Sequence, residues 1–364
     1  MTPTRGDAVS DEAAEGLIVD HDGRKSIGHA SLAQPRSPAT VHGTLVLGLT
    51  AVVVMALAGI LLVVSTTTTQ VAEKPQPTRP PATTLPASHA PGFKPWAPLS
   101  VSSPNGRKLA YMLYATDDLQ ACNALIAAKK VRALGTPTFI DLVVLVTEDV
   151  SAQACQVLTD GGVRPMNVAR WRRKTGGDYY KDSLTKLRIF QELGYDRVIY
   201  IDTDTVIMKN LDALFHLPHA IFWAPRAYWL EKLQPFITSV LLVVDPDNAR
   251  FEQLERAIET ETEVRFDMDV LNVEWQHMAG ILPSEYVVLT THLKHDVDKY
   301  LFGYKSLMDR VNHTYIHHFS YSDQYIKPWT MDVDAIERQP HVLPLFYDLY
   351  EEYWAQRRAL CSFL

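Results

Sequence analysis

The feature that most constrains this chain is an uninterrupted apolar run near its N-terminus. Residues 44–64 read TLVLGLTAVVVMALAGILLVV and contain no charged side chain. At about 1.5 Å per residue, a helix of about twenty residues spans the roughly 30 Å hydrocarbon core of a bilayer. A cleaved signal peptide would have a shorter apolar region closer to the start, and a core helix would have a polar face. We therefore predict a transmembrane signal anchor over residues 44–64.

The segments on either side of this run differ in composition. Residues 1–43 are predicted to be a disordered cytosolic tail. Residues 65–104 are rich in Pro, Thr and Ser, as in PQPTRPPATTLP, and such a segment cannot bury apolar area. It is typical of an extended stalk that holds a domain away from a membrane. Tail, anchor, stalk and a folded domain over residues 105–364 together indicate a single-pass type II membrane protein whose folded domain faces the secretory lumen.

Composition excludes several classes of protein. The chain is 47% hydrophobic and 21% charged, which is ordinary for a chain that buries a core. Its net charge is -7 and it has no long basic run, so we expect no nucleic-acid partner. The three cysteines, Cys122, Cys155 and Cys361, show no zinc-finger spacing. Their pairing cannot be read from the sequence.

Short apolar runs alternate with helical patterns beyond residue 107. We expect strands at residues 109–115, 141–146 and 197–201, and helices at residues 118–134, 151–158 and 182–193. This alternation predicts an α/β domain with a Rossmann-like, mostly parallel sheet and helices on both faces. Ligands of such sheets bind beyond the carboxyl ends of the strands.

Two carboxylates stand at the end of the third predicted strand, in Asp202-Thr203-Asp204. In an extended segment, residues i and i+2 point the same way, so both carboxylates can converge on one hard cation. Without a cation, two like charges at the end of a buried strand would repel each other. The motif alone is common in solvated loops, but its position favours a divalent metal site.

The residues around this motif resemble glycosyltransferase family 8, the glycogenin and galactinol synthase group. The resemblance rests on SLTKLRIFQELGYDRVIYIDTDTVIMKNLDALF, and on His318-Phe319-Ser320 followed by Lys327-Pro328-Trp329. It covers residues 109–329. The His-Phe-Ser segment and the tail LYEEYWAQRRALC are similar to fungal members that resemble Golgi N-acetylglucosaminyltransferases.

The resemblance implies the GT-A fold and a retaining transferase. Such an enzyme moves a hexose or N-acetylhexosamine from a UDP-sugar to a glycan or glycoprotein acceptor and depends on Mn²⁺. The metal ligands would be Asp202, Asp204 and His318, and His317 would point away from the metal, because neighbouring strand residues face opposite sides. The remaining site residues would be the catalytic Asp267 and Lys327 and the donor-binding Thr116, Asp117, Lys186, Thr203 and Lys327.

Several positions depart from the family pattern. Asp117 stands in place of the usual Asn and Gln120 in place of the usual Tyr in the nucleoside turn, and Met268 replaces Gln after Asp267. Thr238-Ser239-Val240 stands where the family has Asn-Ser-Gly, so the donor pocket is expected to differ in detail. The loop to Lys327 is longer than usual, which leaves the place of that lysine open.

Two other functions stay open at this point. One is an inactive GT-A module that binds a sugar nucleotide or a glycan. The other is a sugar-nucleotide hydrolase or nucleotidyltransferase. Neither the donor sugar nor the acceptor can be read from the sequence.

Overall fold

The computed structural model describes residues 106–364 apart from 174–180, 231–235, 261–263, 294–300 and 321–326. The chain divides into two compact units, Met1–Ser88 and His89–Leu364, and every described residue belongs to the second. The predicted tail, anchor and stalk therefore lie outside the described residues. Within the described part, no helix has the length and apolar character needed to cross a bilayer.

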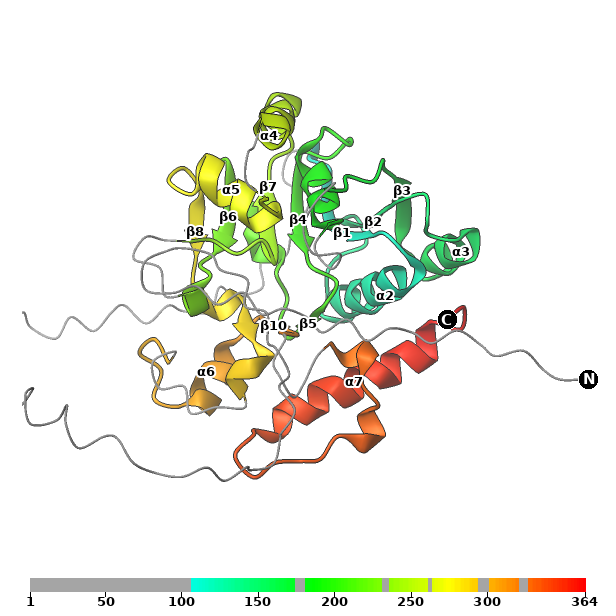
Figure 1. Cartoon of the computed structure of the whole chain (residues 1–364), viewed down its shortest axis with the longest axis vertical. Helices are drawn as coiled ribbons and strands as arrows, with labels where there is room; N and C mark the ends of the chain where they lie inside the picture. The colour runs from blue at the N-terminus through cyan, green and yellow to red at the C-terminus, as the bar shows by residue number, and fades with distance from the viewer. Residues whose placement is uncertain (1–105, 174–180, 231–235, 261–263, 294–300, 321–326) are drawn as a thin grey trace, which may run out of the picture. The chain divides into compact units, whose positions relative to one another are not determined.

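A seven-stranded sheet forms the centre of the described unit (Figure 1). Its order is β3-β2-β1-β4-β7-β6-β8, with β1, β2, β3 and β4 parallel to one another and β7 antiparallel to β4 and β6. The mostly parallel sheet is thus confirmed, with one strand reversed. The strands are β1 (Leu109–Ala115), β2 (Asp141–Val146), β3 (Arg164–Asn167), β4 (Arg197–Ile201), β6 (Phe222–Pro225), β7 (Leu241–Val244) and β8 (Gly280–Leu282).

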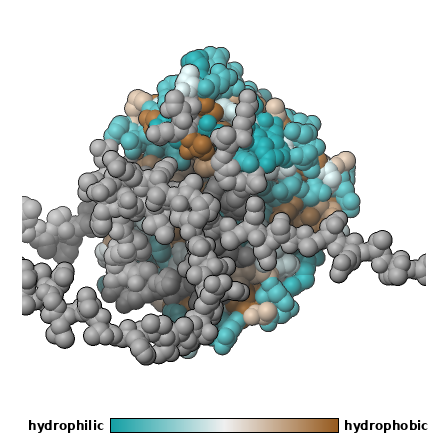
Figure 2. Space-filling model, viewed as in Figure 1, coloured by the Kyte–Doolittle hydropathy of each residue, from teal (hydrophilic) through white to brown (hydrophobic). Residues whose placement is uncertain are grey.

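Helices cover both faces of this sheet, as predicted. Figure 1 shows α2 (Asp118–Ala133) and α3 (Ala152–Asp160) on one side, and α4 (Asn248–Thr260) and α5 (Asp267–Trp275) on the other. Alternate residues of β1 join two separate cores: Tyr111 and Leu113 pack with α2 and α3, whereas Ala110 and Met112 pack with α5. This period of two is what a strand buried on both faces requires. In the coloured part of the face shown in Figure 2, hydrophilic residues predominate and hydrophobic patches are small.

The predicted strands match the observed ones at residues 109–115, 141–146 and 197–201. The helix expected at residues 182–193 is wrong in type and length, because it is a 3₁₀ helix over Ser183–Phe190. Leu184, Leu187 and Phe190 recur at the three-residue period of a 3₁₀ helix, and Ile189 is buried with them.

A second, three-stranded sheet leads to the C-terminal part of the chain. Its order is β5 (Thr205–Ile207), β10 (Ile316–His318) and β9 (Val288–Leu289). The helices α6 (Leu307–His313) and α7 (Pro344–Leu360) belong to this part of the chain. A third core, which includes Val206, Phe319 and Tyr350, joins β5 to α7.

One disulfide links distant parts of the chain. Cys122 in α2 bonds to Cys361, which directly follows α7, across 239 positions of sequence. Cys155 in α3 is a free, half-buried thiol. The bond attaches the end of α7 to the helix that follows β1.

His317 occupies the middle of the small sheet and belongs to the core. Its side chain is fully buried, and neither ring nitrogen has a hydrogen-bond partner. Burial, helped by the charge of Arg310, lowers the pKa of His317 to about 4. The ring is therefore neutral at pH 7, and His318 beside it takes the opposite side of the strand.

We predict that His317 makes the fold sensitive to acid. Because its pKa is lower in the folded chain, its contribution to stability is complete above the unfolded value of about 6.5 and is lost as pH falls toward 4. Between pH 7 and pH 5 this loss amounts to about 2 kcal/mol. His317→Leu should therefore lose less stability over that interval, measured by urea unfolding, whereas the exposed His341→Leu should behave like the unchanged chain. Equal losses in all three proteins would contradict this role.

Candidate active site

The candidate site lies where the strand order of the large sheet reverses. β1 pairs with β2 on one side and with β4 on the other, so the chain leaves the carboxyl ends of β1 and β4 in different directions. Open α/β sheets bind ligands at such a point. Thr116 follows β1 directly and Asp202 follows β4 directly. The two sequence segments predicted to bind the donor thus emerge from neighbouring strands.

Asp202, Asp204 and His318 converge at this point, although more than a hundred residues separate the histidine from the carboxylates. The cause is strand pairing: β5 begins directly after Asp204, and antiparallel pairing with β10 sets His318 opposite Thr205. The backbone N–H of Phe319 donates to the carbonyl of Asp204 at 2.9 Å. The imidazole Nε2 of His318 lies 3.2 Å from Oδ2 of Asp204.

These three side chains fit a divalent cation. Each offers one ligand atom, and the three atoms lie within 4.8 Å of one another. Two carboxylate oxygens and one imidazole nitrogen form a mixed donor set of the kind that binds divalent transition metals. Thr203, between the two carboxylates, is half-exposed. The sequence had suggested that Asp202 and Asp204 lie on a continuing strand. In the structure the chain bends after β4, and this bend brings the two carboxylates together.

Lys186 joins Asp202 to Asp267. It comes from the 3₁₀ helix Ser183–Phe190, and its Nζ lies 2.7 Å from Oδ1 of Asp202 and 2.9 Å from Oδ2 of Asp267. Burial works against the charge of Lys186, but the two carboxylates outweigh it and raise the lysine pKa well above its ordinary value. This lysine is therefore a permanent cation inside the site.

Asp267 lies at the first turn of α5 and is buried against the large sheet. The hydroxyl of Ser239 donates to its Oδ2 at 2.5 Å. Burial alone would raise the pKa of Asp267, but Lys186 and the hydrogen bond from Ser239 lower it. Asp267 is thus a carboxylate at neutral pH, held by a residue of the Thr238-Ser239-Val240 turn.

Lys327 lies beside Asp204, so its longer loop still brings it to the site. Its Nζ is 2.6 Å from Oδ2 of Asp204 and also donates to the backbone carbonyl of Phe319. Burial would raise the pKa of Asp204, but His318 and Lys327 outweigh burial and hold that pKa well below its usual range. Asp204 is therefore ionised, and Lys327 is fixed by two acceptors.

The pKa of Asp202 is shifted in the opposite direction from that of Asp204. Its pKa is raised by burial and by the nearby Asp204 and Asp267, although Lys186 opposes the change. Tyr200 of β4 also donates its hydroxyl hydrogen to Asp202. A bound cation would relieve the repulsion among these carboxylates, which is a second reason for placing a metal here.

Asp117 and Gln120, which depart from the family pattern, both form hydrogen bonds within the turn after β1. Asp117 accepts a hydrogen bond from the backbone N–H of Gln120 at 2.7 Å and so caps the start of α2. Gln120 in turn accepts from the backbone N–H of Thr116 at 3.1 Å. Arg170, which the sequence gave no reason to select, donates to the carbonyl of Thr116 at 2.5 Å. The turn is therefore fixed by its own side chains and by Arg170.

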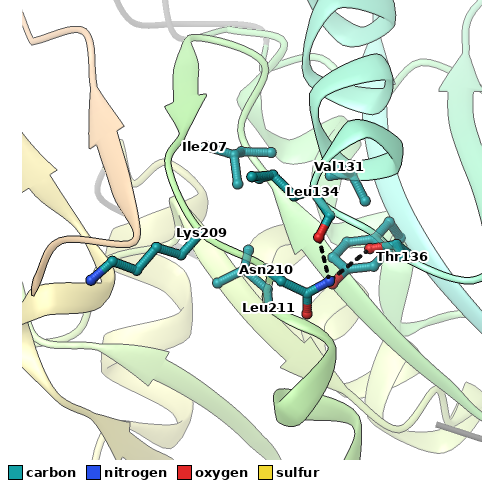
Figure 3. Close-up of a pocket in the computed structure, with 8 residues that line it drawn as sticks. Val131, Leu134, Thr136, Ile207, Lys209, Asn210 and Leu211 are labelled. Atoms are coloured by element: carbon teal, nitrogen blue, oxygen red, sulfur yellow. Dashed lines mark hydrogen bonds between the residues drawn. The ribbon is translucent and has the colours of Figure 1, made fainter. Parts of the chain in front are cut away.

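The Asn-x-Asp part of the family-like motif has a structural role. Asp212 accepts hydrogen bonds from the hydroxyls of Tyr111 at 2.6 Å and Thr136 at 2.9 Å. Asn210 donates to the carbonyl of Leu134 at 3.2 Å, as Figure 3 shows. The pocket beside these residues has no room even for a water molecule, whereas typical ligand sites enclose roughly 300–1,000 Å³. This motif therefore ties the end of α2 to the sheet.

Asn272 is a further residue that the sequence did not single out. It lies in α5, fully buried, and exchanges two hydrogen bonds with the backbone of Ile237, at 2.8 and 2.9 Å. The side-chain amide thus forms the same two hydrogen bonds with Ile237 that a neighbouring strand would form. It holds the segment that carries Ser239 against the helix that carries Asp267.

Comparison with known proteins agrees with this geometry. No protein-family model matches the chain. It is 28% identical over 237 residues to glucose N-acetyltransferase 1 of Aspergillus fumigatus, covering 59% of this chain and 62% of that protein. It is 27% identical over 256 residues to the protein of the same name from Gibberella zeae, covering 64% and 56%. The chain therefore spans less than two thirds of the length of these relatives.

Plant relatives and solved structures extend the comparison. The chain is 28% identical over 183 residues to UDP-glucuronate:xylan alpha-glucuronosyltransferase 1 of Arabidopsis thaliana, covering 49% of this chain and 26% of that protein. An active-site mutant of LgtC has a similar fold, with a TM-score of 0.51 at 15% identity over 70% of this chain and 97% of LgtC. The bifunctional glycosyltransferase WbbM gives a TM-score of 0.50 at 15% identity, covering 70% of this chain and 50% of WbbM. The predicted resemblance is confirmed: in sequence this chain is similar to glycosyltransferases of the family 8 type, and its described part has their GT-A fold.

Proposed function

We propose that this chain is a Mn²⁺-dependent, retaining glycosyltransferase. It would transfer a hexose or N-acetylhexosamine from a UDP-sugar to a glycan or glycoprotein acceptor. The observation that carries the proposal is the convergence of Asp202, Asp204 and His318, flanked by two buried lysines, at the reversal point of the sheet. A cation site beside fixed ammonium groups suits a nucleoside diphosphate, whose negative oxygens need several positive partners.

The mixed oxygen and nitrogen ligands support Mn²⁺ over Ca²⁺. Calcium and magnesium prefer oxygen atoms alone, whereas manganese accepts an imidazole nitrogen beside carboxylates. When bound, the ion would act as a Lewis acid on the diphosphate and would be held by Asp202, Asp204 and His318. Thr203 and the Thr116–Asp117 turn would contact the rest of the donor nucleotide.

Lys327 and Asp267 have different tasks in this mechanism. Negative charge grows on the departing UDP as the glycosidic bond breaks, and the fixed ammonium of Lys327 stabilises that charge more in the transition state than in the ground state. Asp267 is ionised and immobilised by Ser239 and Lys186, so it can orient the transferred sugar without reorganisation. In a retaining reaction the acceptor hydroxyl attacks from the face that UDP leaves.

The cellular location is a further part of the proposal. The disulfide between Cys122 and Cys361 is typical of a protein in an oxidising compartment. Together with the apolar run of residues 44–64, it supports a single-pass type II protein whose catalytic domain lies in the Golgi lumen.

The proposed function is tested by UDP release from candidate donors. The purified full-length chain should release UDP from one of UDP-glucose, UDP-galactose, UDP-xylose, UDP-N-acetylglucosamine and UDP-glucuronate, the last being the donor in the name of the Arabidopsis relative. Release should require Mn²⁺ and should increase when a glycan acceptor mixture is added. Release that no acceptor stimulates would favour a hydrolase, and no release or binding of any donor would favour an inactive module.

The metal site is tested by the Mn²⁺ dependence of UDP binding. Asp204→Asn and His318→Ala should each raise the Mn²⁺ concentration needed for UDP binding by about tenfold or more, as loss of groups that fix a metal usually does. The double variant should add little, because ligands of one ion act as a unit. Calorimetric titration of UDP across a Mn²⁺ series measures this, with His341→Ala as the control. Ordinary metal dependence in Asp204→Asn would overturn the metal site.

Membrane topology is tested by protease protection. In intact microsomes, added protease should remove residues 1–43 and leave the domain of residues 105–364 protected. Epitope tags at the two ends of the chain would show which part survives, and a detergent-treated sample would show that both parts can be cleaved. Digestion of the C-terminal domain in intact microsomes would refute the proposed orientation.

A further inference from the structure

α7 contacts the segment that carries Lys327. The indole Nε1 of Trp354, in the last half of α7, donates a hydrogen bond to the carbonyl of Pro328 at 2.9 Å. Pro328 follows Lys327 directly and opens the short 3₁₀ helix Pro328–Thr330, in which Lys327 is the N-cap. The indole therefore fixes the backbone next to the lysine whose Nζ reaches Asp204.

The same helix also supports the second acceptor of Lys327. Phe319, whose carbonyl accepts from Lys327 Nζ, packs edge-on against Tyr350 and Tyr353 of α7 with ring centroids 5.1 and 6.1 Å apart. The ring centroids of Trp329 and Tyr353 lie 6.0 Å apart. α7 thus contacts both the segment that carries Lys327 and Phe319, whose carbonyl accepts a hydrogen bond from the lysine ammonium group.

α7 is in turn attached to α2 at three points. The hydroxyl of Tyr353 donates to the buried Asn123 at 2.8 Å, and Glu352 pairs with Lys130 at 2.7 Å. The Cys122–Cys361 disulfide closes the end of the helix on α2. The turn at Asp117 connects α2 to β1. Through α2, these contacts therefore fix the position of α7 relative to the large sheet.

We infer that Trp354 is a positioning residue for Lys327, and that the Cys122–Cys361 disulfide maintains this positioning. This inference rests on the proposed function, in which Lys327 meets the diphosphate. Trp354 is half-buried and its ring packs on the core around Tyr353, a contact that a phenylalanine ring can also make. The specific contribution of Trp354 is therefore its hydrogen bond, and a shift of about 1 Å in a charged group is enough to weaken its contact with a ligand substantially.

Trp354→Phe tests the inference, because phenylalanine keeps an aromatic ring and removes the N–H donor. The probe is UDP, titrated calorimetrically into the full-length chain with Mn²⁺. Lys327→Ala should weaken UDP binding about tenfold or more, as expected for loss of a charged hydrogen bond. Trp354→Phe should weaken it about fivefold in the unchanged chain and less than twofold in the Lys327→Ala background, because a positioning residue acts only through the group it positions.

The chain contains a matched control. Trp223 also donates its indole N–H to a proline carbonyl, that of Pro218, at 2.9 Å, but it lies in β6 away from the site. Trp223→Phe removes the same kind of bond and should leave UDP affinity unchanged. Cys361→Ser should reproduce part of the Trp354→Phe effect, again only when Lys327 is present, whereas Cys155→Ser should have none. Thermal melts of each variant show whether it is folded.

The outcomes separate this inference from the proposed function. UDP affinity that is unchanged in Trp354→Phe, or reduced by the same factor with and without Lys327, overturns the positioning role while the effect of Lys327→Ala stands. UDP affinity that is unchanged in Lys327→Ala overturns both, since the lysine would then not meet the diphosphate.

Discussion

The site depends on the antiparallel pairing of β10 with β5. β5 begins immediately after the carboxylates of Asp202 and Asp204, and β10 ends at His318, so the register of two short strands determines whether the imidazole reaches them. The same pairing brings Phe319 to the backbone of Asp204 and so provides an acceptor for Lys327. A slip of one residue would exchange His318 for His317 and bury the wrong ring. The fully buried, neutral His317 is one reason why that register is specified.

Charge organises the rest of the site. The carboxylates of Asp202, Asp204 and Asp267 are separated by two lysines, and each lysine links one of the candidate metal ligands Asp202 and Asp204 to another group. Lys186 extends the site toward Asp267, whereas Lys327 extends it toward the C-terminal part of the chain. An arrangement of fixed charges in a buried position suits a reaction in which charge develops on a leaving diphosphate.

Much of this arrangement could be predicted from the sequence. Runs such as LAYMLYA and RVIYI identified the strands, because strands buried on both faces are continuously apolar and short. The position of Asp202 at a strand end followed from the same pattern, and family-like motifs indicated His318 and Lys327. The structure brings these residues together, including Lys327, whose loop length had left its place open.

Other features depend on tertiary contacts that no local pattern encodes. A helix was predicted at residues 182–193, but the apolar spacing did not show that it would be the shorter 3₁₀ helix Ser183–Phe190, because periods of three and of 3.6 residues differ little over two turns. The support of Asp267 by Ser239, and the pairing of Cys122 with Cys361, join residues that are distant in sequence. Asn210 and Asp212 belong to the family-like segment, and the structure shows that they tie α2 to the sheet.

The proposed mechanism requires one metal ion held jointly by Asp202, Asp204 and His318. A crystal structure of the chain with Mn²⁺ and UDP, with anomalous data collected on both sides of the manganese absorption edge, tests this. We expect a single anomalous peak in contact with both carboxylates and with Nε2 of His318, and with the diphosphate on its open side. A peak bound elsewhere, or a diphosphate bound at this point with no contact to the ion, would contradict it.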